Sequence, residues 1–193
     1  MPGIDLFATP WWVNLFVLVP IVPYALSRKE KIPFGARKLM LAALFGAAFG
    51  FVEAAVVIYL RAAIGLWPGP PAQALVSFPE KLARIEIFRE AATIVMLGAT
   101  ALLVGQSTRQ KIAAFLWIFA FWDAFYYVWL RLAIGWPTTL LSSDVLFLIP
   151  TPWVAQVWFP ILISSLTAIA IWLRCSRRAA SPAGEDARPA ASG

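Results

Sequence analysis

Acidic side chains interrupt the apolar segments of this 193-residue chain at a few separated positions. Glu53 and Asp123 each lie inside an apolar run, and Glu86, Arg89 and Glu90 lie at the start of another. A charged side chain at the centre of a membrane helix costs about 2.5 to 3.5 kcal/mol on insertion scales, so such a group should face the protein interior. There it would be paired, protonated or hydrated. These acids are therefore candidates for handling a proton, a cation or another ligand.

The spacing of these residues predicts that they converge. Glu86 and Glu90 are four residues apart and share one helical face. With a rise of 1.5 Å per residue, Glu53 lies about 12 Å below Arg61 along its helix. We expect the acids to meet in the outer half of the membrane, below an outer loop that carries one more acid. The candidate site residues are Glu53, Glu86, Glu90, Asp123 and Asp144, with Arg61, Arg89 and Arg131 as counter-charges.

A purely structural interpretation of the same residues stays open. The acids could form a structural polar network that holds the helices together. Arg61 and Arg131 could be interfacial anchors whose long side chains reach water. The aromatic residues around Asp123, including Trp122, Tyr126 and Tyr127, could form one wall of a pocket or simply pack in the core. Most other tryptophans fall where an aromatic belt at the outer interface is expected.

The composition sets the class of the protein. Apolar residues make up 61% of the chain, charged residues 13%, and the mean hydropathy is +0.77, which excludes a water-soluble enzyme with a polar surface. The absence of histidine excludes His-ligated metal sites and the Ser-His-Asp triad. A single cysteine, Cys175, excludes an internal disulfide and a cysteine-ligated metal cluster. An all-carboxylate metal site remains, and its ligands would be Glu53, Glu90 and Asp123.

Five long apolar runs predict an all-α integral membrane protein. The first contains Pro20 and Pro23, so a kinked or partly unwound helix is expected there. We expect residues 1–178 to form the transmembrane domain and residues 179–193 to form a disordered cytoplasmic tail. The five predicted spans cover residues 9–26, 39–60, 87–104, 112–130 and 153–173.

Basic residues predict the orientation of the chain in the membrane. Eleven of the 16 lysines and arginines fall in the connection after the first span, the connection after the third and the C-terminal tail. The positive-inside rule then places the N-terminus outside and the C-terminus in the cytoplasm. The predicted location is a cytoplasmic membrane of the bacterial inner-membrane type. The formal net charge of +6 is explained in this way and not by nucleic-acid binding.

The chain also resembles itself. Residues Phe49–Gly65 and Phe119–Gly135 align without a gap at an offset of 70 residues, and eight of the 17 positions are identical. The alignment places Glu53 opposite Asp123 and Arg61 opposite Arg131. We interpret this as a duplication of a helix pair, spans two–three and four–five, in which both copies keep the same direction across the membrane.

Three classes of function fit these features. The leading hypothesis is a subunit of a larger respiratory or photosynthetic type of membrane complex, whose carboxylate cluster handles protons, cations or a quinone-like ligand. The second is a stand-alone proton or small-cation transporter. The third is a membrane enzyme with an all-carboxylate metal site. The expected partners are the lipid bilayer, other membrane subunits or further copies of the chain, and a quinone or pigment as a ligand.

Overall fold

The computed structural model describes residues 4–65 and 79–176, and this part of the protein is mostly helical (71%). It contains a 3-10 helix, η1 (Trp11–Ile21), and five α-helices. These are α1 (Val22–Leu26), α2 (Ala36–Ala63), α3 (Glu80–Val104), α4 (Thr108–Ile134) and α5 (Trp158–Arg174). The described residues also form four short strands: β1 (Ile32–Pro33), β2 (Ser143–Phe147), β3 (Trp153–Gln156) and β4 (Cys175–Ser176).

Three of the helices, α2, α3 and α4, are long and apolar enough to cross a membrane. The prediction of long apolar helices is confirmed for these three. The segments Trp11–Leu26 and Trp158–Arg174 are apolar but shorter. The fifth predicted span is wrong at its start, because residues 153–156 form strand β3 and α5 begins only at Trp158. An apolar run does not by itself distinguish a buried strand from a helix.

The first predicted span is partly unwound, as its prolines indicated. Residues Trp11–Ile21 form a 3-10 helix that contains Pro20, and Pro23 lies in the first turn of α1. Proline has no N–H to donate, so each of these residues removes one helical hydrogen bond. Asn14 holds the start of η1, because its amide accepts from the N–H of Ala8 at 2.8 Å and donates to the Ala8 carbonyl at 2.9 Å.

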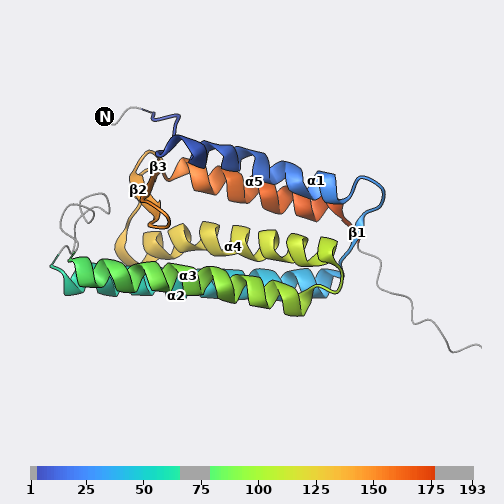
Figure 1. Ribbon diagram of the computed structural model, residues 1–193, viewed down its shortest axis with the longest axis horizontal. Helices are drawn as coiled ribbons and strands as arrows, with labels where there is room; N and C mark the ends of the chain where they lie inside the picture. Colours follow the sequence, from blue (N-terminus) through green and yellow to red (C-terminus); the bar gives the residue numbers. More distant parts are fainter. Residues whose placement is uncertain (1–3, 66–78, 177–193) are drawn as a thin grey trace, which may run out of the picture.

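Helix α4 is the centre of the molecule (Figure 1). It packs against α2 and α3 on one side and against α5 on the other, while η1 and α1 pack on α5. Gly46 and Gly50 let α2 approach α4 closely, since a Cβ atom at these positions would lie 2.6 Å from the Ile118 carbonyl oxygen and 2.7 Å from that of Trp122. These two glycines thus serve the packing of α2 on α4.

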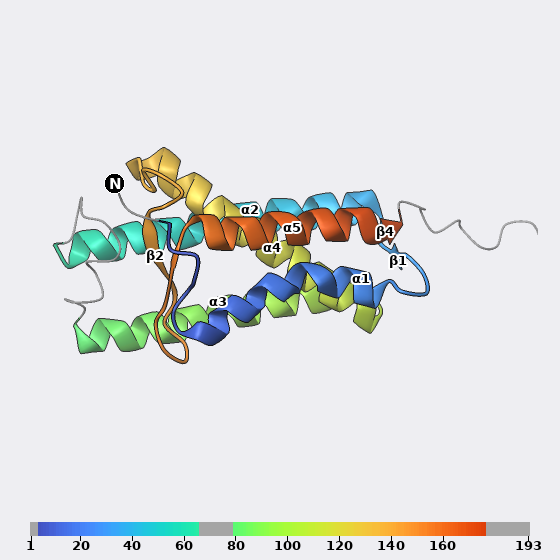
Figure 2. The same ribbon diagram turned by 90° about the horizontal axis from the view of Figure 1, so that it is seen from above.

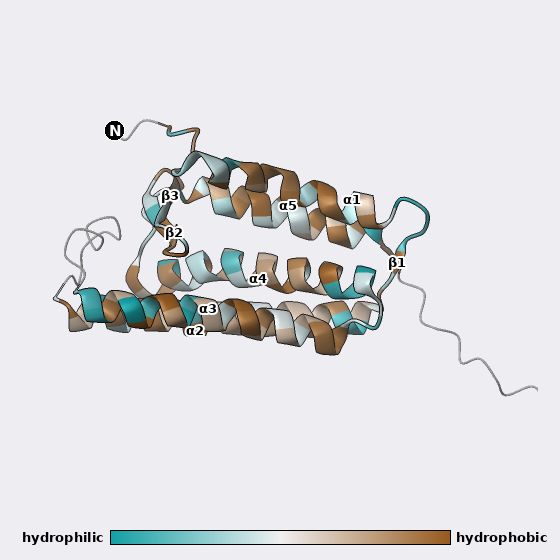
Figure 3. Ribbon diagram, viewed as in Figure 1, coloured by the Kyte–Doolittle hydropathy of each residue, from teal (hydrophilic) through white to brown (hydrophobic). Residues whose placement is uncertain are grey.

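The two ends of the bundle differ. At one end, β1 pairs with β4, and Arg174 donates to the hydroxyl of Ser27 at 2.7 Å. At the other end, β2 and β3 form an antiparallel hairpin that runs across the bundle from the side of α2 to the side of α3 (Figure 2). Hydrophilic residues lie in the α1–β1 connection and at the hairpin end of α3, whereas most of the helical surface is hydrophobic (Figure 3). The predicted tail, residues 179–193, lies outside the described residues.

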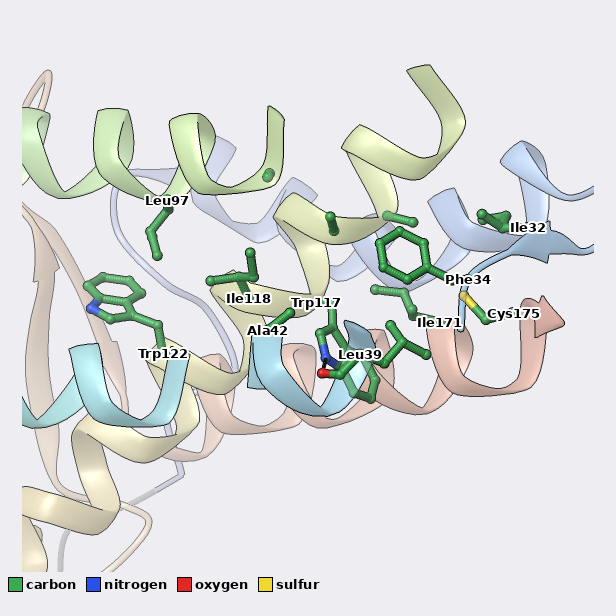
Figure 4. Close-up of a cluster of buried hydrophobic side chains, with 13 residues drawn as sticks. Ile32, Phe34, Leu39, Ala42, Leu97, Trp117, Ile118, Trp122, Ile171 and Cys175 are labelled. Carbon is green, nitrogen blue, oxygen red and sulfur yellow. Dashed lines mark hydrogen bonds between the residues drawn. The ribbon is translucent and has the colours of Figure 1, made fainter. Parts of the chain in front are cut away.

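The half of the bundle that lies away from the hairpin is filled by an apolar cluster (Figure 4). Leu97, Ile118 and Ile171 have no exposed surface, and Trp117 donates its indole N–H to the Leu39 carbonyl at 2.8 Å. Trp122 lies at the edge of this cluster, with its indole nitrogen on the side away from the other labelled side chains. This apolar cluster therefore occupies the half of the bundle away from the hairpin, and the buried charged residues lie in the other half.

Candidate functional site

A cavity of about 580 Å³ opens at the hairpin end of the bundle. Its walls are α2, α3 and α4, and the β2–β3 hairpin with the turn between its strands covers it. Seven charged residues line it, and all of them were predicted from the sequence: Glu53, Arg61, Glu86, Arg89, Glu90, Asp123 and Asp144. The structure thus places these seven side chains around one cavity, and their function stays a prediction.

Arg89 holds two of the carboxylates. Its guanidinium forms ion pairs with Glu53 of α2 and with Glu86 one turn earlier on α3, and its Nε donates to Glu86 at 2.9 Å. The hydroxyl of Thr93 also lies within 3.5 Å of the Glu53 carboxylate. The side chains of Glu53 and Glu86 are only 10% and 11% exposed. The ionic cluster that joins α2 to α3 is therefore poorly hydrated. Three charges are thus largely satisfied within the protein.

Glu90 is bound to the covering hairpin and not to a cation. Both of its carboxylate oxygens accept from the backbone N–H of Leu148, at 2.8 and 3.1 Å. The side chain lies on the same face of α3 as Glu86, with 7% of the residue exposed. This contact fixes the turn of the hairpin over the cavity, and it leaves the negative charge of Glu90 without an ion-pair partner among the described residues.

Asp123 comes from α4 and points to the boundary between α4 and α5. Its carboxylate accepts from the hydroxyl of Ser164 at 2.7 Å. No ion pair to Asp123 exists in the part of the chain that the structure describes. Asp123 is therefore a second acid of the cavity that has a neutral partner only.

Asp144 enters the cavity from strand β2 and is 2% exposed. Tyr127 donates its hydroxyl to the Asp144 carboxylate at 3.0 Å. Burial raises the pKa of Asp144 to about 6, although the nearby charge of Arg61 and the hydrogen bonds from Tyr127 and Val145 lower it. Arg61 itself lies over the ring of Trp136, 5.4 Å from the ring centroid.

The cavity therefore carries an excess of acid. Five carboxyl groups face two guanidinium groups, and Arg89 is already shared between two of the five. Aromatic side chains of α4 and the hairpin, among them Trp122, Tyr126 and Phe147, line the same space. The indole N–H of Trp122 has no hydrogen-bond partner among the described residues, although the residue is only 5% exposed. A buried unpaired donor is costly, and it marks a place where a ligand oxygen could bind.

One predicted residue does not belong to the site. Arg131 is exposed, and its guanidinium donates to the carbonyl oxygens of Gly135 and Pro137 just after its own helix. The carbonyls that end a helix attract a cation, so this arginine stabilises the end of α4. Arg61 differs, because it is 6% exposed and lines the cavity.

A metal centre receives no support from the geometry. Within residues 4–65 and 79–176, no three acidic or cysteine side chains lie close enough together to hold a metal ion. Glu53, Glu90 and Asp123 line the same cavity but are engaged by Arg89, Leu148 and Ser164 respectively. The site is better described as an ionic cluster beside three carboxylates, Glu90, Asp123 and Asp144, that have only neutral hydrogen-bond partners among the described residues.

Sequence reasoning missed the contribution of the hairpin backbone. The N–H of Leu148 and the segment from Pro150 to Pro152 line the cavity, and only the isolated Asp144 in an apolar run signalled that this connection turns inward. Comparisons with known proteins add no assignment. No protein-family model matches the chain, and no significant similarity was found to a curated protein or to a solved structure.

Proposed function

We propose that this protein is an integral membrane protein that binds a small organic cation in the carboxylate-lined cavity. The observation that carries the proposal is the charge balance of that cavity, in which Glu90 and Asp123 have only neutral hydrogen-bond partners. In a partly dry cavity two such carboxylates attract a positive ligand more strongly than they would in water. The volume of about 580 Å³ lies in the range of small-molecule sites.

The aromatic residues favour an organic cation over a proton or a metal ion. Trp122, Tyr126 and Tyr127 lie beside Asp123 on the cavity wall, and aromatic faces attract ammonium groups. The indole N–H of Trp122 has no hydrogen-bond partner among the described residues, and an oxygen atom on the same ligand would accept its hydrogen bond. A hydroxylated or carbonyl-bearing ammonium compound satisfies both requirements.

The orientation is part of the proposal. The basic residues between α1 and α2, the two in the first turn of α4 and Arg174 at the end of α5 all lie at the end opposite the hairpin (Figure 1). If that end faces the cytoplasm of a bacterial-type cell, the cavity opens in the outer half of the membrane. We propose five membrane segments in this arrangement, with the two shorter ones, η1–α1 and α5, packed together beside α4.

Binding is a better proposal than passage through the bundle. The apolar cluster around Leu97, Ile118 and Ile171 fills the half of the bundle below the cavity. A transport route would need polar groups there, because a cation in an apolar medium pays a large desolvation cost. The prediction that the chain is a subunit of a larger complex stays a prediction, which native mass spectrometry on protein released from its own membrane would check.

The test compares choline with 3,3-dimethylbutan-1-ol, a neutral compound of the same shape, on protein in lipid nanodiscs. We expect choline to bind at least tenfold more tightly, which corresponds to about 1.4 kcal/mol. Glu90→Gln and Asp123→Asn should each reduce choline affinity. Glu80→Gln is the matched control, because this glutamate lies on the same helix with 80% of its side chain exposed. Equal affinity for the two compounds would refute the proposal.

A further inference from the structure

A second and smaller pocket, of about 150 Å³, lies beside the charged cavity. It is bounded by η1, α4, α5 and the β2–β3 hairpin. Its lining is almost entirely apolar, with side chains such as Val13, Phe16, Phe119, Phe159 and Ile163. The pocket is therefore suited to a hydrocarbon group and not to an ion.

The two spaces share part of their walls. Asp123, Leu146 and Phe147 line both of them. Asp123 contributes the carboxylate at this boundary, and Ser164, the hydroxyl that binds it, lines the apolar pocket. A cation held at Asp123 thus lies directly beside an apolar space.

The two hydroxyl groups that line the apolar pocket are already used within the protein, whereas the indole N–H of Trp153 has no hydrogen-bond partner among the described residues. The hydroxyl of Thr167 donates to the carbonyl oxygen of Ile163 at 2.7 Å, and that of Ser164 donates to Asp123. Neither hydroxyl proton is free to bind a polar ligand. On the η1 side, Phe16 is 38% exposed, so the pocket is bordered by a residue of the lipid-facing surface.

We propose that this pocket receives the hydrocarbon chain of the cation that the charged cavity binds, so that the ligand is an amphiphile with an ammonium head group. The inference rests on the proposed function, because the carboxylates of the cavity are taken to hold the head group. It adds the chemical class of the rest of the ligand. An amphiphile dissolved in the bilayer would reach the pocket sideways, past Phe16, without crossing the water phase.

The test uses choline and its analogues in which one N-methyl group is replaced by an n-butyl, n-hexyl or n-octyl chain, on protein in nanodiscs, with empty nanodiscs to subtract partitioning into lipid. Burial of one methylene group is worth about 0.8 kcal/mol, so each added methylene should tighten binding about fourfold until the pocket is full. Ala120→Phe fills the pocket, because Ala120 lines it. This variant should bind choline normally and lose the dependence on chain length.

Two further variants keep the test decisive. Val19→Trp fills the same pocket from η1, where the residue is only partly buried, and it replaces Ala120→Phe if that protein does not fold. Gly98→Leu is the control for added bulk, since a side chain there meets nothing within 4 Å and Gly98 lines neither space. It should keep the full dependence on chain length.

The outcomes separate the two proposals. A chain-length dependence in the wild type that both filling variants lose supports the amphiphile. Choline binding that depends on Glu90 but does not strengthen with chain length overturns this inference and leaves the proposed function intact. A dependence that persists in both filling variants also overturns it, because the chain then lies elsewhere. If choline does not bind at all, the proposed function itself fails.

Discussion

Replacement of Asp144 by asparagine tests the electrostatics of the cavity directly. The carboxylate is almost completely buried, and burial raises its pKa from 3.8 to about 6 in spite of the nearby Arg61 and the hydrogen bond from Tyr127. Asparagine has nearly the same shape and keeps an oxygen that can accept the tyrosine hydroxyl, but it cannot ionise. The comparison of the two proteins across pH therefore isolates the charge of this one group.

The sign follows from proton linkage. Between about pH 3.8 and pH 6 the unfolded chain has already released the Asp144 proton, whereas the folded protein still holds it. The unfolded state then binds fewer protons, so the free energy of unfolding falls as the pH rises. The stabilising contribution is complete below the unfolded pKa and is lost by the time the pH exceeds the folded pKa. A shift of about two pH units corresponds to a loss of about 3 kcal/mol.

The assay is the free energy of unfolding in mixed micelles, measured by SDS titration from pH 4 to pH 8 for the wild type and for Asp144→Asn. We expect the wild type to lose about 3 kcal/mol relative to the variant as the pH rises through this range, with no further change above pH 7. Asp5→Asn is the control, because Asp5 is exposed and its backbone N–H donates to the side chain of Gln156 in β3, at the same end of the bundle. A difference that stays constant, or that grows in favour of the wild type with rising pH, would refute the reasoning.

Three other changes test the packing around the site. Arg89→Met should destabilise the protein by about 3 to 5 kcal/mol, because it leaves the buried carboxylates of Glu53 and Glu86 unpaired. Neutralising both glutamates in the same protein should recover most of this loss, as measured by SDS titration. Gly50→Ala should cost about 1 to 3 kcal/mol because its Cβ would lie 2.7 Å from a backbone oxygen of α4, whereas Gly98→Ala, which meets nothing, should be neutral or stabilising. Trp117→Phe should cost about 1 to 2 kcal/mol, measured in the same way, through loss of the buried bond to the Leu39 carbonyl.

Much of the site could be predicted because helical geometry converts sequence distance into depth. Glu53 and Asp123 occur at the same distance before an arginine, and Glu90 occurs about as far into a helix that runs in the opposite direction. Antiparallel membrane helices with these spacings bring the acids to one level. The burial cost of a carboxylate then turns each of them inward. The three long helices followed from apolar length alone.

The hairpin could not be predicted in the same way. Residues 145–149 form an unbroken apolar run, but prolines at positions 150 and 152 remove two backbone donors from the segment that follows. The backbone pairs instead across the hairpin, with Ser143 opposite Gln156. A contact such as that of Leu148 with Glu90 uses a main-chain N–H, which every residue except proline has. The identity of residue 148 therefore gave no indication of its contact with Glu90.

The two acids that the predicted duplication aligns have different partners in the structure. Glu53 and Asp123 each accept from a hydroxyl 40 or 41 residues later, and the aligned glycines at the two helix ends, Gly65 and Gly135, both have positive φ. The duplication itself stays a prediction. The difference is Arg89, which follows Glu53 in the first copy and has no counterpart near Asp123. One copy thus carries a neutralised acid that joins two helices, while the other carries an acid without a counter-ion. We infer that the first is scaffold and that the second is where a cation binds.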